Sequence, residues 1–282
     1  MVEDFMKVLK INGTPTPLIN TEFATLWRIA RPGGDLVIKH FKPGVFKDEA
    51  PGLDYCRAKA ATGHAISILE IAEDLCLMPY LDGPTLGNQA RSGDLIAADR
   101  ELAWIGKRLQ AVDHDYLKLP HVADWYRDLF SLRYAPDCPA DLNGNMHAAA
   151  ETTKSLLAEI SDPVALHGDL HHDNVIRTQM GTSAIDAKGV YAPPAFEASN
   201  ALRNPEGLSE QFASIDLQRQ RTQIYAEYLD RPPCEIAAWA ATRCALSIAW
   251  CANGLQAGDS ADSQTLSILM YLAREFSTQP RK

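Results

Sequence analysis

The sequence predicts an α+β fold in which a small antiparallel sheet precedes a larger, mainly helical lobe. Short strand-like segments separated by turn residues fill residues 1–81. Across residues 82–282 the apolar residues recur mostly at helical spacing. Within this second part, the polar octet at residues 167–174 lies between short apolar runs. These observations predict a sheet lobe over 1–81, a helical lobe over 82–282 and a functional site at the octet.

Length and charge restrict the class of protein. A chain of 282 residues can form one large domain or two small ones, with a substantial core and no need of disulfides. The net charge of −9 argues against a nucleic-acid partner, which needs basic patches, and suits a cationic small molecule. The 6 cysteines form no C-x-x-C pair and indicate reduced thiols in the cytoplasm. We expect no signal peptide and no membrane span, because Glu3 and Asp4 precede any apolar run and no such run is long enough.

The first elements alternate between helical and extended patterns. Residues 1–12 suit a short amphipathic helix that Pro15 and Pro17 would end. Residues 24–29 and 36–41 are strand candidates, and the turn rich in proline and glycine between them predicts a hairpin.

A second pair of strands is predicted at residues 65–72 and 75–81, and the break in the pattern after this pair marks the expected lobe boundary. Beyond it, helical spacing predicts helices at 95–112, 122–133, 143–160, 208–229, 234–253 and 262–276.

The octet leads into a second predicted hairpin. Residues 164–166 are a short apolar run that would deliver the octet, and residues 175–177 and 183–185 are two further runs joined by a polar link. Because a hairpin brings its two ends together, Asn174 and Asp186 should lie side by side at its base.

The spacing of polar residues in the octet matches the catalytic loop of kinases. Asp169 precedes Asn174 as D-x-x-x-x-N, and His167 stands two residues before the Asp. In that pattern Asp169 accepts the proton of a substrate hydroxyl, while Asn174 and Asp186 hold Mg²⁺ against the phosphates of ATP. We expect His167 to support the loop by hydrogen bonding.

The octet also permits a zinc site or a plain turn. His167 and His171 are four residues apart and would share a helix face, as in a zinc site, although Gly, Asp and Asn propagate a helix poorly. The same residue types also form ordinary turns. No role follows for His171 or His172.

Lys39 lies between apolar residues in the strand 36–41. A lone lysine there could simply extend to water, but the kinase pattern predicts that it contacts the nucleotide phosphates. Such a lysine needs an acidic partner on the next helix, and Glu49 is preferred over Asp48 and Asp54. Acids at a helix start can also act only on the helix dipole.

The residues of these motifs resemble those of the aminoglycoside phosphotransferase family, most closely those of its streptomycin 6-phosphotransferase and hydroxyurea phosphotransferase branch. The matching segments are His167-Gly168-Asp169-Leu170-His171 with Asn174, Ile185-Asp186-Ala187-Lys188-Gly189, Phe196-Glu197-Ala198-Ser199-Asn200 and Asn204-Pro205. Ala187 and Ser199 replace the usual Pro and Ala. The resemblance implies a protein-kinase-like two-lobe fold with ATP between the lobes.

The resemblance also assigns the adenine hinge and the phosphate loop. It places the hinge at residues 78–81, with backbone groups of Pro79 and Leu81 as hydrogen-bond partners. Residues 19–25 occupy the place of the phosphate loop and lack the glycines of protein kinases.

The expected function is therefore ATP- and Mg²⁺-dependent transfer of a phosphoryl group to a hydroxyl of a small, cationic acceptor of the streptomycin type. Glu197 and Asp173 are the candidate carboxylates for such an acceptor, and Glu197 could equally be an acid near the start of a helix. The alternatives are a kinase of another metabolite (hydroxyurea, a sugar amine or a choline-like compound), a zinc-dependent hydrolase and a non-catalytic binding protein. The oligomeric state does not follow from the sequence.

Overall fold

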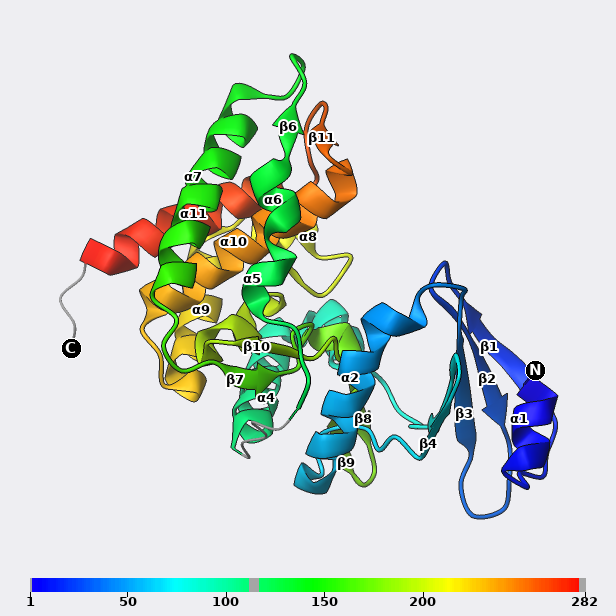
Figure 1. The fold of residues 1–282 in the computed structure, drawn as a ribbon. Coiled ribbons are helices and arrows are strands. Elements are labelled where there is room, and N and C mark those ends of the chain that lie inside the picture. The colour runs from blue at the N-terminus through cyan, green and yellow to red at the C-terminus, as the bar shows by residue number, and fades with distance from the viewer. Residues whose placement is uncertain (1, 112–116, 279–282) are drawn as a thin grey trace.

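The computed structural model describes residues 2–111 and 117–278. A sheet lies at the N-terminal end of the molecule and the helices gather at the other end, with helix α2 (Phe46–Lys59) between them (Figure 1). The predicted α+β order, sheet first and helices after, is confirmed.

Within the described residues, five strands form one antiparallel sheet in the order β1-β2-β3-β5-β4. The strands are β1 (Pro15–Asn20), β2 (Ala24–Ile29), β3 (Leu36–Phe41), β4 (Glu70–Ala72) and β5 (Leu75–Pro79). The strands predicted at 24–29 and 36–41 are observed with these bounds. The predicted pair 65–72 and 75–81 is shorter at its outer ends.

The sequence pattern does not predict strand β1, because prolines at this place also fit the end of a helix. Helix α1 (Val2–Val8) is shorter than the predicted 1–12, and Met1 lies outside the described residues. Pro15 and Pro17 belong to β1, which is an edge strand with mostly exposed residues. An edge strand tolerates proline because the missing N–H costs no ladder bond on its open side.

The sheet is covered on both faces by helices. Phe5 and Met6 of α1 pack in one apolar cluster with Ile38 of β3. Leu53 of α2 packs in another cluster with Phe41 of the same strand. Because side chains alternate along a strand, Ile38 of β3 points toward α1, and the odd-numbered residues of β3 point toward the interior between the lobes.

The C-terminal part contains the predicted helices and several short elements. Its helices are α3 (Leu86–Gln89), a π-helical turn (Ala90–Asp94), α4 (Leu95–Gln110), α5 (Val122–Trp125), α6 (Arg127–Ser131), α7 (Ala140–Ala158), α8 (Ser209–Phe212), α9 (Ile215–Leu229), α10 (Pro233–Ala252) and α11 (Ser263–Thr278). Its paired short strands are β7 (Val164–Leu166) with β10 (Val190–Ala192), β8 (Val175–Thr178) with β9 (Gly181–Ala184), and β6 (Arg133–Tyr134) with β11 (Leu255–Gln256).

Two predicted helices are divided in the structure, and the end of a third lies outside the described residues. The helix predicted at 122–133 is divided into α5 and α6 at Tyr126, whose ψ of 0° leaves the helical range. The helix predicted at 208–229 is likewise divided into α8 and α9. For the helix predicted at 95–112, α4 ends at Gln110 and Val112 lies outside the described residues. Among residues 2–111 and 117–278, no helix is long and apolar enough to cross a bilayer.

Helix α2 is pressed against the segment that follows the β8–β9 hairpin. A Cβ atom at Gly52 would overlap the carbonyl oxygen of Ala187, and one at Gly189 would overlap the carbonyl oxygen of Pro51. Gly189 also has a positive φ of 67°, a conformation that favours glycine. Two glycines thus allow backbone to touch backbone and fix α2 relative to the hairpin.

This contact predicts opposite effects for two glycine substitutions. Gly52→Ala should destabilise the protein by about 1–3 kcal/mol, because the new methyl group has no room. Gly144→Ala in α7 should stabilise it by about 0.5–1 kcal/mol, since among the described residues nothing lies within 4 Å of a Cβ there. Thermal and urea unfolding of both variants measure this. Two shifts of the same sign would contradict the tight contact at Gly52.

Candidate active site

The β8–β9 hairpin brings the predicted metal-binding residues together. Val175 pairs with Ala184 across it, and Ile185 donates its N–H to Asn174 O at 2.8 Å, which closes its base. Asn174 and Asp186 therefore leave the hairpin at adjacent positions. Asp186 has a positive φ of 58°, a backbone turn that directs the chain away from the hairpin.

Asp169 lies beside the hairpin and is held by hydrogen bonds on both carboxylate oxygens. Asn200 donates to Oδ1 at 2.8 Å, Arg243 donates to Oδ1 at 3.4 Å, and Asn174 donates to Oδ2 at 3.3 Å. The side chain is still 19% exposed, so a substrate hydroxyl can reach it. These donors fix the orientation of the carboxylate, which is what a general base requires.

The roles of Asn200 and Arg243 were not found from the sequence. Asn200 ends the Phe196–Asn200 motif, and its carbonyl accepts a hydrogen bond from Asn204 Nδ2 at 2.8 Å. Arg243 comes from α10, where its guanidinium lies 4.7 Å from the ring centre of Trp250. The Phe196–Asn200 motif could have pointed to Asn200 as a site residue. Arg243 stands 74 residues from Asp169 in the sequence, and only the fold brings the two side chains together.

Lys39, Glu49 and Asp186 meet as the kinase pattern predicts. Lys39 Nζ lies 2.6 Å from Asp186 Oδ1 and 3.6 Å from Glu49 Oε2. Glu49 is buried, whereas Asp48 and Asp54 are exposed, so the geometry selects Glu49 as the partner of Lys39. Burial would raise the pKa of Asp186, but the adjacent Lys39 lowers it below its ordinary value.

A cavity of about 400 Å³ opens between the sheet and the hairpin. Its polar end contains Lys39, Glu49 and Asp186, and its walls are mainly apolar. Pro79 and Leu81, the predicted hinge residues, line it. A cavity with apolar walls and a charged end can hold a flat ring and a chain of phosphates.

The residues present fit a magnesium ion. Asn174 commits its amide nitrogen to Asp169, which turns its amide oxygen away from that residue. An amide oxygen and the carboxylate of Asp186 are oxygen ligands of the kind that Mg²⁺ prefers.

The histidines of the octet have separate partners. His167 accepts from Asp169 N–H on Nδ1 (3.3 Å), so its Nε2–H donates to Ile185 O (3.0 Å). Burial lowers its pKa to about 4, which keeps it neutral. His171 accepts from Asp173 N–H. Among the described residues no group of three His, Cys, Asp or Glu side chains could hold a metal, so the zinc alternative is not supported.

Glu197 is not a substrate-facing residue, and this prediction was wrong. The side chain is buried beneath the octet, where it accepts backbone N–H groups from His167 at 3.1 Å and Gly168 at 3.4 Å. It lies inside a 3-10 helix (Pro194–Ala198) that packs against α10. Burial raises its pKa to about 7. The carboxylate therefore supports the backbone at the start of the octet.

Asp173, the other predicted substrate carboxylate, is already paired. Arg91 binds it through two hydrogen bonds, Nη2 to Oδ1 at 2.7 Å and Nη1 to Oδ2 at 3.2 Å. Burial would raise the pKa of Asp173, and Arg91 lowers it below its ordinary value. The charge of Asp173 is thus used to attach the loop to the turn before α4.

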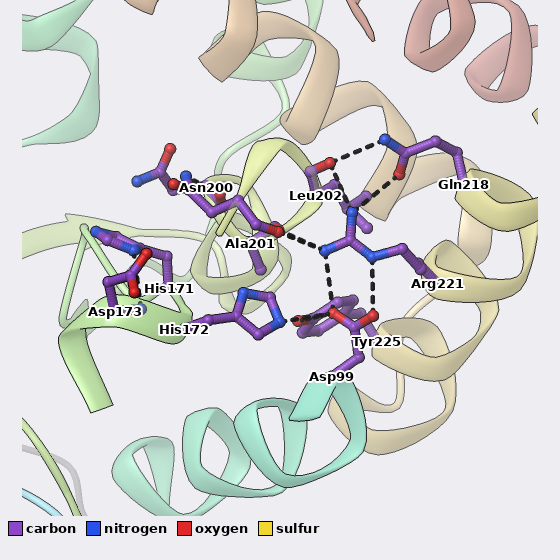
Figure 2. Close-up of polar contacts among 11 residues, drawn as sticks. Asp99, His171, His172, Asp173, Asn200, Ala201, Leu202, Gln218, Arg221 and Tyr225 are labelled. Carbon is purple, nitrogen blue, oxygen red and sulfur yellow. Dashed lines mark hydrogen bonds and ion pairs between the residues drawn. The ribbon is translucent and has the colours of Figure 1, made fainter. Parts of the chain in front are cut away.

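A buried network explains His172 (Figure 2). Its Nε2 lies 3.0 Å from Oδ1 of Asp99 in α4, and Tyr225 in α9 donates to the same oxygen at 2.7 Å. Arg221 in α9 binds both oxygens of Asp99, at 2.8 and 3.1 Å. Burial would raise the pKa of Asp99, but Arg221 and His172 hold it at about 2.

The same arginine reaches the segment that carries Asn200. Its Nη1 donates to the carbonyl oxygen of Leu202 at 2.9 Å, and Nη2, which also binds Asp99, lies 2.8 Å from the carbonyl oxygens of Ala201 and Asn204. Figure 2 shows Arg221 between Asp99 on one side and the carbonyls of Ala201 and Leu202 on the other. The network therefore fixes the octet and the Asn200 segment relative to each other.

The fold and the site together define a class: small-molecule kinases with a protein-kinase-like fold. Similar solved structures include a choline/ethanolamine kinase family protein from Mesorhizobium loti (14% identical, covering 99% of this chain and 96% of that one, TM-score 0.65). Another is an aminoglycoside phosphotransferase in ternary complex with ADP and hygromycin B (12% identical, 99% and 99%, TM-score 0.63). A third is an amicoumacin kinase in complex with AMP-PNP and Ca²⁺ (14% identical, 97% and 92%, TM-score 0.63). At such identities the likeness shows the fold, and it confirms the predicted fold class.

Residues 14–254 match the aminoglycoside/hydroxyurea antibiotic resistance kinases, and the chain belongs to this family. The family predicted from the motifs is thereby confirmed. A streptomycin 3''-kinase from Klebsiella pneumoniae is 33% identical over 84 residues. This match spans 29% of the chain and 29% of the length of that relative.

The buried Glu197 predicts a pH dependence of stability. Its pKa rises on folding from 4.5 to about 7, so between these values the folded state binds more protons than the unfolded state. Its contribution to stability is therefore greatest below pH 4.5 and is lost as the pH rises through about 7. We expect the stability of the native protein relative to Glu197→Gln to fall from about pH 5 to about pH 8 in urea unfolding. A difference that does not change with pH would contradict this.

Proposed function

We propose that the protein is an ATP-dependent O-phosphotransferase that transfers the γ-phosphoryl group to a hydroxyl of a small molecule, with a streptomycin-type aminoglycoside as the first candidate acceptor. Residues 1–81 form the nucleotide-binding lobe, and residues 82–282 form the catalytic and substrate-binding lobe. Membership of the family supports the reaction. The observation that carries the proposal is the position of Asp169, an accessible carboxylate held by Asn174, Asn200 and Arg243 beside a cavity that has Asp186 and Lys39 at its charged end.

Each residue of the site has a defined task in this reaction. Asp169 orients the acceptor hydroxyl and takes its proton. Lys39 steadies the nucleotide phosphates, and Glu49 holds Lys39 in place. Pro79, through its carbonyl, and Leu81 serve as the hinge beside the adenine, while His167 supports the loop as a neutral hydrogen-bond partner.

Asn174 and Asp186 would hold Mg²⁺. A bound ion would supply positive charge that neutralises the negative charge of the phosphates. Phosphoryl transfer depends mainly on positioning and charge neutralisation, and the fixed carboxylates together with Lys39 supply both in this proposal.

The charge of the acceptor bears on its identity. A streptomycin-type acceptor carries guanidinium groups, yet Glu197 and Asp173, the carboxylates expected to receive them, are committed within the protein. Hydroxyurea is neutral and needs no such carboxylate. The deciding experiment is coupled ADP release with streptomycin, hydroxyurea, kanamycin and choline measured side by side. Turnover with choline alone would remove the antibiotic assignment and keep the kinase, whereas no turnover together with no binding of Mg·ATP would overturn the kinase itself.

Asp169→Asn should lower kcat by about 10²–10⁴-fold, which is the usual effect of a positioned general base. The KM for ATP should change little, because Asp169 faces the acceptor and not the cavity. Steady-state kinetics at saturating acceptor measure both constants. A variant with native turnover would show that another group removes the proton.

Asp186→Ala should weaken the binding of Mg·ATP more than that of ATP in the presence of EDTA, because the carboxylate is the charged ligand of the metal. Titration calorimetry under both conditions gives the two constants. Equal losses with and without the metal would place the metal site elsewhere.

A further inference from the structure

Lys188 has no task in the reaction as described so far, although it belongs to the Ile185–Gly189 segment and lines the nucleotide cavity. Its Nζ donates a hydrogen bond to Glu49 Oε1, while Lys39 lies near the other oxygen, Oε2. Glu49 therefore holds two lysines, one on each oxygen. The side chain of Lys188 is 36% exposed against 13% for Lys39, so Lys188 is the more accessible of the two.

The backbone of Lys188 connects the metal-binding residue to the catalytic loop. Lys188 follows Asp186 by two residues, and its N–H donates to His167 O at 2.9 Å. Gly189 N–H donates to the same oxygen at 3.1 Å. His167 stands two residues before Asp169. The backbone of Lys188 is therefore tied to the segment of Asp186, which would hold the metal, and to the segment of Asp169, which would take the acceptor proton.

Three amides of the turn between β1 and β2 are already bonded within the turn. This turn lines the same cavity through Thr21 and Phe23. Phe23 and Ala24 donate their N–H groups to Thr21 Oγ1 at 3.2 and 3.0 Å, and Thr21 donates its own to Ala24 O at 2.9 Å. The turn also carries Glu22, whose charge repels phosphate. In protein kinases a glycine-rich loop at this place covers the phosphates, whereas these three amides of the turn are already occupied.

The kinase pattern gives Lys39 a different contact. Lys39 comes from β3 and lies 2.6 Å from Asp186, which is the place of the lysine that contacts the α- and β-phosphates, so it is the cation for the inner phosphates. We propose that Lys188 is a catalytic residue that binds the terminal phosphate of ATP and stabilises the negative charge of the phosphoryl group during its transfer. This rests on the proposed kinase function and adds a residue to it.

Glu49 then has a second task. Besides holding Lys39, it sets the position of Lys188. The glycine contact between α2 and residues 187–189 fixes the helix that carries Glu49 relative to the segment that carries Lys188. A cation that is fixed before the reaction stabilises developing charge without the cost of reorganisation.

The test compares two nucleotides that differ in the terminal phosphate. Lys188→Met should weaken the binding of Mg·AMP-PNP by about tenfold or more, as expected for loss of a hydrogen bond to a charged group. It should leave the affinity for Mg·ADP unchanged, because ADP lacks the phosphate that Lys188 contacts. With an acceptor, kcat should fall by about 10²-fold or more, and Lys188→Arg should restore part of it. Lys154→Met, at an exposed lysine that pairs with Glu151 on the surface of α7, serves as the control.

The outcomes separate this inference from the proposed function. A native protein that binds neither nucleotide overturns the kinase assignment and this inference with it. Native binding together with equal weakening of AMP-PNP and ADP in Lys188→Met, or with no change in either, overturns the inference alone and makes Lys188 a structural partner of Glu49. Thermal unfolding of each variant shows that the comparison is made on folded protein.

Discussion

The buried ion pair between Asp99 and Arg221 is the interaction on which the geometry of the site depends. Neither side chain is exposed. Removing two charges from water is expensive, and such a pair does not reliably add stability over apolar residues of the same size. Here the pair also forms hydrogen bonds with other parts of the chain. Asp99 forms hydrogen bonds with His172 and Tyr225, and Arg221 donates to backbone carbonyls of residues 201–204. The pair is better understood as a means of positioning two loops than as a source of stability.

The carboxylate of Asp169, the proposed general base, is consequently supported at successive levels. Asn200 and Arg243 hold the side chain of Asp169, Glu197 holds the backbone just before it, and the Asp99 network holds the loop just after it. Some of this support is costly, since a carboxylate with a pKa raised to about 7 resists burial in its charged form. Local conflicts of this kind are expected at functional sites, where a sequence departs from the optimum for stability.

The parts of the site that the sequence predicted are those encoded by local spacing. The octet, the hairpin after it and the strand that carries Lys39 were predictable because each depends on residues a few positions apart. The contacts that hold them were not, since Asp99 and Arg221 are 122 residues apart and nothing in the chain marks them as partners. Glu197 was misassigned for a related reason: an acidic residue near a site suggests a binding group, and its burial becomes visible only in the fold. Strand β1 was missed because its prolines fit an exposed edge strand as well as a helix end.

The contact between α2 and residues 187–189 has a consequence for control of the enzyme. Protein kinases are switched by moving the helix that carries the glutamate partner of the lysine, together with a long activation segment. Here the helix touches the following segment backbone to backbone at Gly52 and Gly189, and it cannot swing outward without losing that contact. The contact therefore opposes regulation by outward movement of this helix. A compound that acts by stabilising a displaced helix would have to break this contact in order to bind.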